Sequence, residues 1–107
     1  MRNTMTTLAQ NFLNGTRKEH WHEDETAVQL FRYLMQGSLY GEDYHPHIKE
    51  IRKKKPKDLT LPETEIYLTA LAKGDRLNEG LFDQSIQSGL LETLLRKWLD
   101  EKEGGNG

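Results

Sequence analysis

The chain has 107 residues, of which 35% are hydrophobic and 30% are charged, and its formal net charge is -2. This length suits a single domain, and the small net charge excludes a global field that would draw the whole chain to nucleic acid or membrane. The chain has no cysteine, which excludes a disulfide framework, a thiolate metal site and a cysteine nucleophile. It has neither an apolar run of the about 18 residues that a membrane span needs nor an apolar signal-peptide core, so we expect a cytoplasmic protein without a membrane partner.

Two helices are predicted in the first third of the chain. Residues 5–14 place Leu8 and Phe12 four positions apart, and Gly15 follows as a stop signal. Residues 23–36 begin with three carboxylates, which suit the N-terminus of a helix, and continue with a stripe of apolar side chains. A pair of glycines then predicts a break before the next element.

The segment 46–55 is predicted as a short helix with a narrow buried face. Pro46 lies in its first turn, where a proline is tolerated, and Pro56 follows its end. Ile48 and Ile51 are its only aliphatic residues, so we expect it to pack on the rest of the domain along one side only.

The next predicted helices begin with recognisable caps. Thr60-Leu-Pro-Glu63 matches a capping box, and the helix that it opens extends to about Lys73. A further helix is expected from Asp75 onward. Gly80 lies inside it, and because glycine costs up to about 1 kcal/mol relative to alanine in a helix, we interpret this glycine as a close helix contact.

Residues 90–102 have the strongest helical pattern, with an apolar side opposite a charged side. The apolar side carries five leucines and a tryptophan: Leu90, Leu91, Leu94, Leu95, Leu99 and Trp98. No segment shows the sustained alternation that predicts a strand. We therefore expect an all-α fold, a small irregular bundle of five to six short helices, as one domain over residues 1–103 with a flexible tail at 104–107.

All four histidines fall into two His-x-His pairs: His20 with His22, and His45 with His47. On a helix, side chains two positions apart point about 200° away from each other, whereas in extended chain they share a face. We expect both pairs in non-helical chain, where together they could bind zinc or nickel. The simpler alternative is that they are ordinary polar loop residues.

Six cations lie within nine residues, and they form the clearest candidate binding surface. They are Lys49, Arg52, Lys53, Lys54, Lys55 and Lys57. If all six met phosphates, the log of the affinity would fall with the log of the salt concentration with a slope of about -5. An acidic protein partner and a merely solvated face are the alternatives, and the single arginine argues against base-specific readout.

Tryptophan and tyrosine are typical of protein interfaces. Trp21 and Tyr44 stand in polar surroundings, so we consider an exposed interface and the core equally for both. Trp98 lies on the leucine-rich side of residues 90–102, through which a second copy could bind to form a homodimer. The helices of residues 60–102 could alternatively form a helix-turn-helix, although the exposed side of the last helix is more acidic than a recognition helix requires.

Motifs for catalysis are missing: the sequence has no glycine-rich phosphate loop, no nucleophile elbow and no HExxH. Our first hypothesis is a small non-enzymatic interaction protein, a regulator, adaptor or inhibitor of a protein partner, of the kind that phages and plasmids often carry. The second is a nucleic-acid-binding accessory protein that uses the basic run at 49–57. The third is a metal-responsive protein that uses the two His-x-His pairs.

Overall fold

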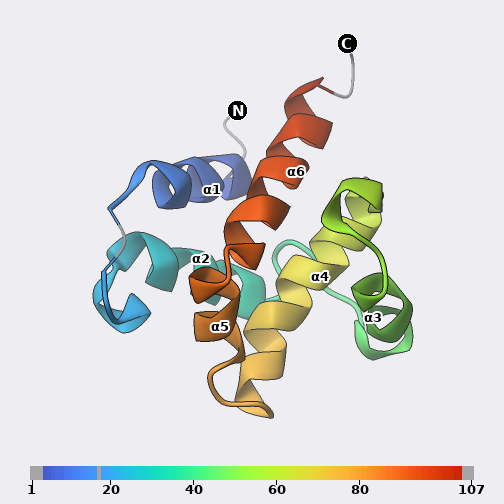
Figure 1. The fold of residues 1–107 in the computed structure, drawn as a ribbon, viewed down its shortest axis with the longest axis horizontal. Coiled ribbons are helices and arrows are strands. Elements are labelled where there is room, and N and C mark those ends of the chain that lie inside the picture. Colours follow the sequence, from blue (N-terminus) through green and yellow to red (C-terminus); the bar gives the residue numbers. More distant parts are fainter. Residues whose placement is uncertain (1–3, 17, 105–107) are drawn as a thin grey trace.

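The structure is a computed structural model that describes residues 4–16 and 18–104. Over these residues the chain forms six α-helices and three short 3₁₀ turns without a strand (Figure 1). In chain order they are α1 (Thr4–Asn14), η1 (Trp21–Glu23), α2 (Glu25–Met35), α3 (His45–Arg52), η2 (Pro56–Asp58), α4 (Leu61–Lys73), η3 (Gly74–Arg76), α5 (Leu81–Gln87) and α6 (Leu90–Gly104). The predicted all-α bundle is confirmed for this part of the chain.

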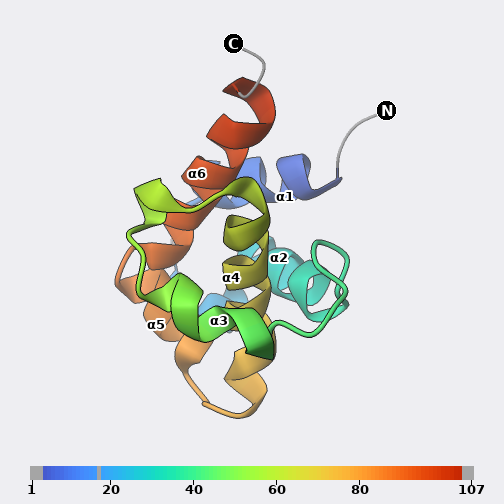
Figure 2. The same cartoon turned by 90° about the vertical axis from the view of Figure 1, so that its right-hand side faces the viewer.

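Helix α4 is the centre of the bundle. Helices α2, α3, α5 and α6 all pack against it (Figures 1 and 2), and seven of its thirteen residues are buried. A helix that is buried around most of its circumference needs small residues where its neighbours approach closely, and Ala70 and Ala72 supply them. The predicted capping box opens it: the Thr60 hydroxyl accepts from the Glu63 N–H at 3.2 Å, and the Glu63 carboxylate accepts from the Thr60 N–H at 2.9 Å.

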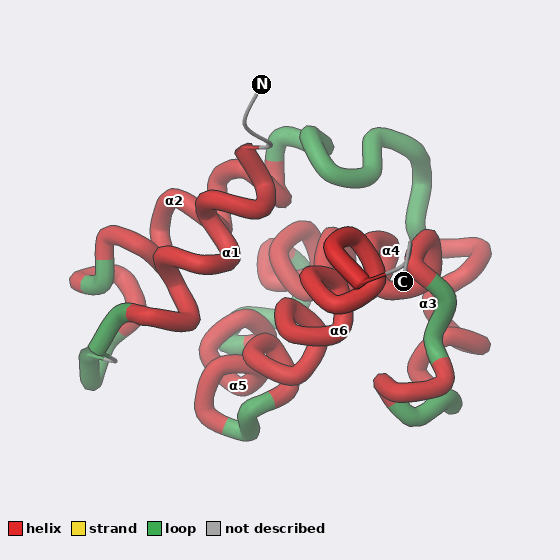
Figure 3. The backbone as a smooth tube through the Cα atoms, turned by 90° about the horizontal axis from the view of Figure 1, so that it is seen from above, coloured by secondary structure: helices red, strands yellow, loops and turns green. Residues whose placement is uncertain are grey.

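The remaining helices surround α4 on different sides. Helices α1 and α2 pack against each other, and the view from above places them across the bundle from α3 (Figure 3). The loop of residues 36–44 leads from α2 to α3 along the outside of the bundle. Helix α3 packs on α4 through Ile48 and Ile51, which are the buried residues of that helix, as predicted.

The glycine at position 80 is not a close helix contact, and that interpretation is wrong. Gly80 precedes α5 in the left-handed conformation, with φ at +94°, and no atom would lie within 4 Å of a Cβ added there. The expected single helix is divided into η3 and α5 by this turn. Asp75 joins the two parts, because its carboxylate accepts from the backbone N–H groups of Gly80 at 3.2 Å and Phe82 at 3.1 Å.

Helix α6 ends the described part of the chain and extends two residues beyond the predicted range of 90–102. Its last residue is Gly104, which we expected to begin a flexible tail. Residues 105–107 of that tail lie outside the described residues. None of the helices described is long and apolar enough to cross a membrane.

Candidate functional site

Neither histidine pair is extended over its whole length, as a shared metal ion would require. His20 and His22 flank Trp21 at the start of η1, and the ring of His22 stacks on the Trp21 ring with centroids 3.9 Å apart. His45 and His47 belong to the first turn of α3, so their side chains diverge by about 200°. The prediction of non-helical chain is wrong for His45 and His47, because the proline between them fits the first turn of a helix. It is also wrong for His22, which lies in η1, whereas His20 precedes η1 in an extended conformation.

The two pairs also lie in different surroundings. His20 and His22 line a hollow of about 500 Å³, the acidic hollow, and its other lining residues are Glu19, Trp21, Asp75, Glu79, Gly80 and Asp83. His45 lines a separate hollow. Within the described residues, no group of three or more His, Asp or Glu side chains comes together to hold a metal ion. The zinc or nickel site remains a prediction, which a calorimetric titration with either metal tests.

The start of α3 is organised by a local hydrogen-bonded pair. Asp43 accepts from the ring Nδ1–H of His45 at 2.7 Å and from its backbone N–H at 3.0 Å. The hydrogen bond from the His45 ring, with a smaller contribution from the backbone N–H, lowers the pKa of Asp43 below its ordinary value. His45 is thereby held in one orientation, with its ring stacked on Tyr44 at a centroid distance of 4.2 Å.

The basic run has the geometry of an exposed surface. We call residues 49–57 the basic segment; it covers the second half of α3, the turn that follows and the first residues of η2. Every one of its cations is exposed to solvent: Lys49, Arg52, Lys53, Lys54, Lys55 and Lys57. The segment lies at the edge of the bundle that carries α3 (Figure 3).

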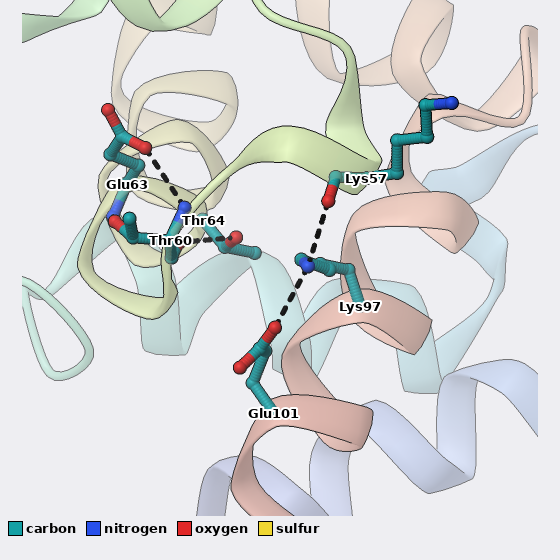
Figure 4. A network of polar contacts seen from close by, with 6 residues as sticks. All are labelled: Lys57, Thr60, Glu63, Thr64, Lys97 and Glu101. Carbon is teal, nitrogen blue, oxygen red and sulfur yellow. Dashed lines mark hydrogen bonds and ion pairs between the residues drawn. The ribbon is translucent and has the colours of Figure 1, made fainter. Parts of the chain in front are cut away.

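The backbone of the basic segment is fixed from both sides. Ile51 is buried within it and Leu59 is buried just after it. The ammonium of Lys97, on α6, donates to the backbone carbonyl of Lys57 at 3.1 Å and to the carboxylate of Glu101 at 2.8 Å (Figure 4). The cations therefore project from an ordered backbone that is joined to the last helix.

Only part of this positive charge is neutralised within the chain. Lys54 pairs with Glu63 at 2.5 Å, and Lys53 pairs with Glu50 at 3.5 Å. The hydrogen bond from Lys54, followed by the one from the Thr60 backbone, lowers the pKa of Glu63. The other four cations of the segment make no ion pair with any described residue: Lys49, Arg52, Lys55 and Lys57.

Two aromatic residues considered for an exposed interface are buried in the core of the chain. Trp21 is 9% exposed, and its ring packs against Phe31 and Phe82 at centroid distances of 4.8 and 5.0 Å. Tyr44 is 7% exposed. The interface interpretation is therefore wrong for both side chains, because residues that are distant in sequence cover them.

The leucine-rich side of α6 packs on its own domain and is not a free interface. Trp98 is fully buried, and its indole N–H donates to the carboxylate of Glu65 at 2.9 Å. Three leucines of this side are also fully buried: Leu91, Leu94 and Leu95. Trp98 was predicted as an interface residue, and that prediction is corrected, since helices α1, α4 and α5 cover this side.

Two further hollows were not predicted from the sequence. One, of about 530 Å³, lies among α4, α5 and α6 and is lined by leucines and uncharged polar residues. The other, of about 500 Å³, contains His45 together with Lys73, Arg76 and Leu77 from the end of α4 and the turn after it. The sequence contains only a slight signal for the second hollow. Lys73 and Arg76 lie close to Gly74, which we interpreted only as the stop of a helix.

No family model, curated protein or solved structure matches the chain. The surfaces just described are therefore the features of the chain that bear on its function.

Proposed function

We propose that the chain is a non-enzymatic interaction protein, a regulator, adaptor or inhibitor, that binds an acidic surface of a protein partner through the basic segment. One observation carries the proposal: four exposed cations that form no ion pair with a described residue project from a backbone that the core already fixes. An ordered backbone loses little conformational entropy on binding. Positive charges held in place also steer an acidic partner toward the correct orientation.

Three features favour an acidic protein over a nucleic acid. Five of the six cations are lysines, whereas arginine is the side chain that reads phosphate and guanine in two-point contacts. The basic segment contains no aromatic residue on which a base could stack. Helix α6, the candidate recognition helix of a helix-turn-helix, exposes Glu92, Asp100 and Glu103, which would repel a DNA backbone.

The test compares two variants that lose the same number of positive charges. The first removes three unpaired cations of the basic segment: Lys49→Gln, Arg52→Gln and Lys55→Gln. The matched control removes three exposed cations elsewhere: Arg32→Gln, Arg96→Gln and Lys102→Gln. A labelled poly-glutamate peptide and a DNA duplex of equal charge serve as probes, and fluorescence anisotropy at two salt concentrations measures the dissociation constants.

We expect the wild-type chain to bind poly-glutamate and the first variant to bind it about tenfold more weakly, because three exposed charge pairs contribute roughly 0.5 kcal/mol each. The control variant should retain wild-type affinity. Binding that weakens equally in both variants would show a general charge effect and would overturn the proposal. Tighter binding of the duplex, lost only in the first variant, would replace the protein partner with nucleic acid.

A further inference from the structure

Residues from four neighbouring elements converge on the hollow that contains His45, which we call the Tyr44 hollow. Its lining residues are Met35, Tyr44, His45, Lys73, Arg76 and Leu77. They come from the end of α2, the start of α3, the end of α4, and η3 with the residue after it. None of them belongs to the basic segment, so whatever this hollow binds is independent of the proposed function.

The charged and donor groups of the Tyr44 hollow all favour an anion. Lys73 and Arg76 contribute an ammonium and a guanidinium, and neither makes an ion pair with a described residue. No carboxylate of the described residues lines the hollow. The Nδ1–H of His45 donates to the Asp43 carboxylate at 2.7 Å. The Nε2 atom is therefore the ring nitrogen of His45 that is left for a ligand.

The hydroxyl of Tyr44 is a further donor in the hollow. Tyr44 is 7% exposed, and its hydroxyl forms no hydrogen bond to a described residue. Among the described residues, the fully buried side-chain atom that lacks a partner is Thr69 Oγ1 and not this hydroxyl, so the Tyr44 hydroxyl is open to solvent and to a ligand. This hydroxyl lies beside Gly74, 3.8 Å from where a Cβ on that glycine would be, and the ammonium of Lys73 lies beside Gly37, 3.6 Å from where a Cβ on Gly37 would be. Both residues line the hollow, so either group can donate to an anion bound there.

The apolar part of the lining indicates what the anion carries. Leu77 is 83% exposed and is the one large hydrophobic side chain left exposed in the described part of the chain. Met35, which also lines the hollow, is only partly buried. An apolar group bound between these two side chains would cover surface that otherwise faces water.

We propose that the Tyr44 hollow binds a small amphiphilic organic anion, with one carboxylate or phosphate on an apolar body. Lys73 and Arg76 pair with the anionic group, the Tyr44 hydroxyl donates to it, and Met35 and Leu77 contact the body. Charge-assisted bonds fix the orientation of the ligand, and the apolar contacts add affinity.

The experiment titrates the full chain with octanoate and follows the backbone amide signals by nuclear magnetic resonance. Octanol and inorganic phosphate are the matched probes, since octanol lacks the charge and phosphate lacks the apolar body. We expect saturable shifts around Tyr44 and Lys73 with octanoate, and at least about fivefold weaker binding of either matched probe. Absence of saturable shifts with octanoate, or shifts centred on Leu71 and Leu90 in the apolar hollow, would overturn the proposal.

Two variants separate this site from the rest of the surface. Lys73→Gln with Arg76→Gln should weaken octanoate binding about tenfold or more, and Tyr44→Phe, which keeps the buried ring, should weaken it severalfold. Arg32→Gln with Arg96→Gln is the control of equal charge and should bind as the wild type does. Unchanged octanoate binding in both site variants contradicts the proposal.

The dispersion of the amide spectrum reports whether each variant is folded. If the double variant does not fold, Tyr44→Phe alone decides. Binding of poly-glutamate should be the same in Tyr44→Phe and in the wild type. Octanoate binding therefore tests the Tyr44 hollow, and poly-glutamate binding separately tests the proposed function of the basic segment.

Discussion

Thr69 shows what a single buried hydroxyl contributes at the centre of the bundle. Its side chain is fully buried in α4, and its hydroxyl has no hydrogen-bond partner among the described residues. A buried hydroxyl without a partner costs about 1–3 kcal/mol, whereas valine fills nearly the same space with no polar group. We expect Thr69→Val to raise the free energy of unfolding by about 1 kcal/mol, measured by urea denaturation.

Thr64, in the same helix, provides the matched control. It is equally buried, but its hydroxyl donates to the backbone carbonyl of Thr60 at 2.9 Å. Thr64→Val removes this hydrogen bond and should lower the free energy of unfolding. If Thr69→Val lowers the free energy of unfolding as much as Thr64→Val does, the unpaired hydroxyl of Thr69 does not destabilise the fold, and the expectation is contradicted.

Individual residues were the least predictable part of the candidate sites. The sequence identified the six cations because their spacing along the chain is itself the signal. It did not reveal the burial of Trp21, since the covering ring of Phe82 comes from α5. It also did not connect Tyr44 with Lys73 and Arg76, which meet only because α3 packs against α4.

At the scale of one element, the start of α4 should depend on pH. The pKa of Glu63 is lowered from 4.5, chiefly by the hydrogen bond from Lys54 and then by that from the Thr60 backbone. A carboxylate with a depressed folded pKa stabilises the fold above its unfolded pKa, and this contribution is lost as the pH falls through the folded value. Glu63→Gln should therefore cost about 0.5 kcal/mol at neutral pH and nothing at about pH 2.

Denaturation of the wild type and the Glu63→Gln variant at several pH values checks this expectation. Glu42→Gln is the control, because Glu42 is exposed and has no ion pair with a described residue. A difference between wild type and Glu63→Gln that stays constant from neutral to acidic pH would contradict the role of the Lys54 hydrogen bond.

Elements with local signals were predicted well, and elements shaped by distant contacts were not. The capping box at Thr60 and the leucine pattern after Gly89 act within one helix, so α4 and α6 were found nearly at their observed bounds. The expected helix from Asp75 was divided, because the Asp75 carboxylate bonds two backbone N–H groups beyond a left-handed Gly80. Such a side-chain bond across a turn leaves no periodic pattern.

For the whole molecule, the buried side of α6 predicts an effect on stability without an effect on association. Leu94 is fully buried within its own chain, so Leu94→Ala leaves a cavity and should lower the free energy of unfolding by about 3 kcal/mol. Light scattering at micromolar concentrations should give the mass of one chain for both the wild type and the variant.

A wild-type mass of two chains, reduced to one by Leu94→Ala without loss of stability, would contradict this account. It would mean that the leucine-rich side of residues 90–102 binds a second copy, as the sequence alone allowed.

The class of fold followed from periodicity, but the arrangement around α4 did not. Helical patterns show which side of each helix is apolar, and they do not show which partner covers it. Helix α4 is buried on most sides, so its sequence does not indicate which of the four neighbouring helices contacts which side. The positions of the hollows between the helices depend on those contacts.

The contact between the first and last helices has a consequence for synthesis on the ribosome. Helix α1 packs against α6, and α6 supplies Leu91, Leu95 and Trp98 to the core. The core therefore closes only after residues 90–104 have emerged. At about 5–20 residues per second, translation of the chain takes roughly 5–20 s. From the synthesis of α4 until α6 has emerged, the face of α4 that α6 covers is exposed, which makes the nascent chain a substrate for chaperones that bind exposed apolar segments.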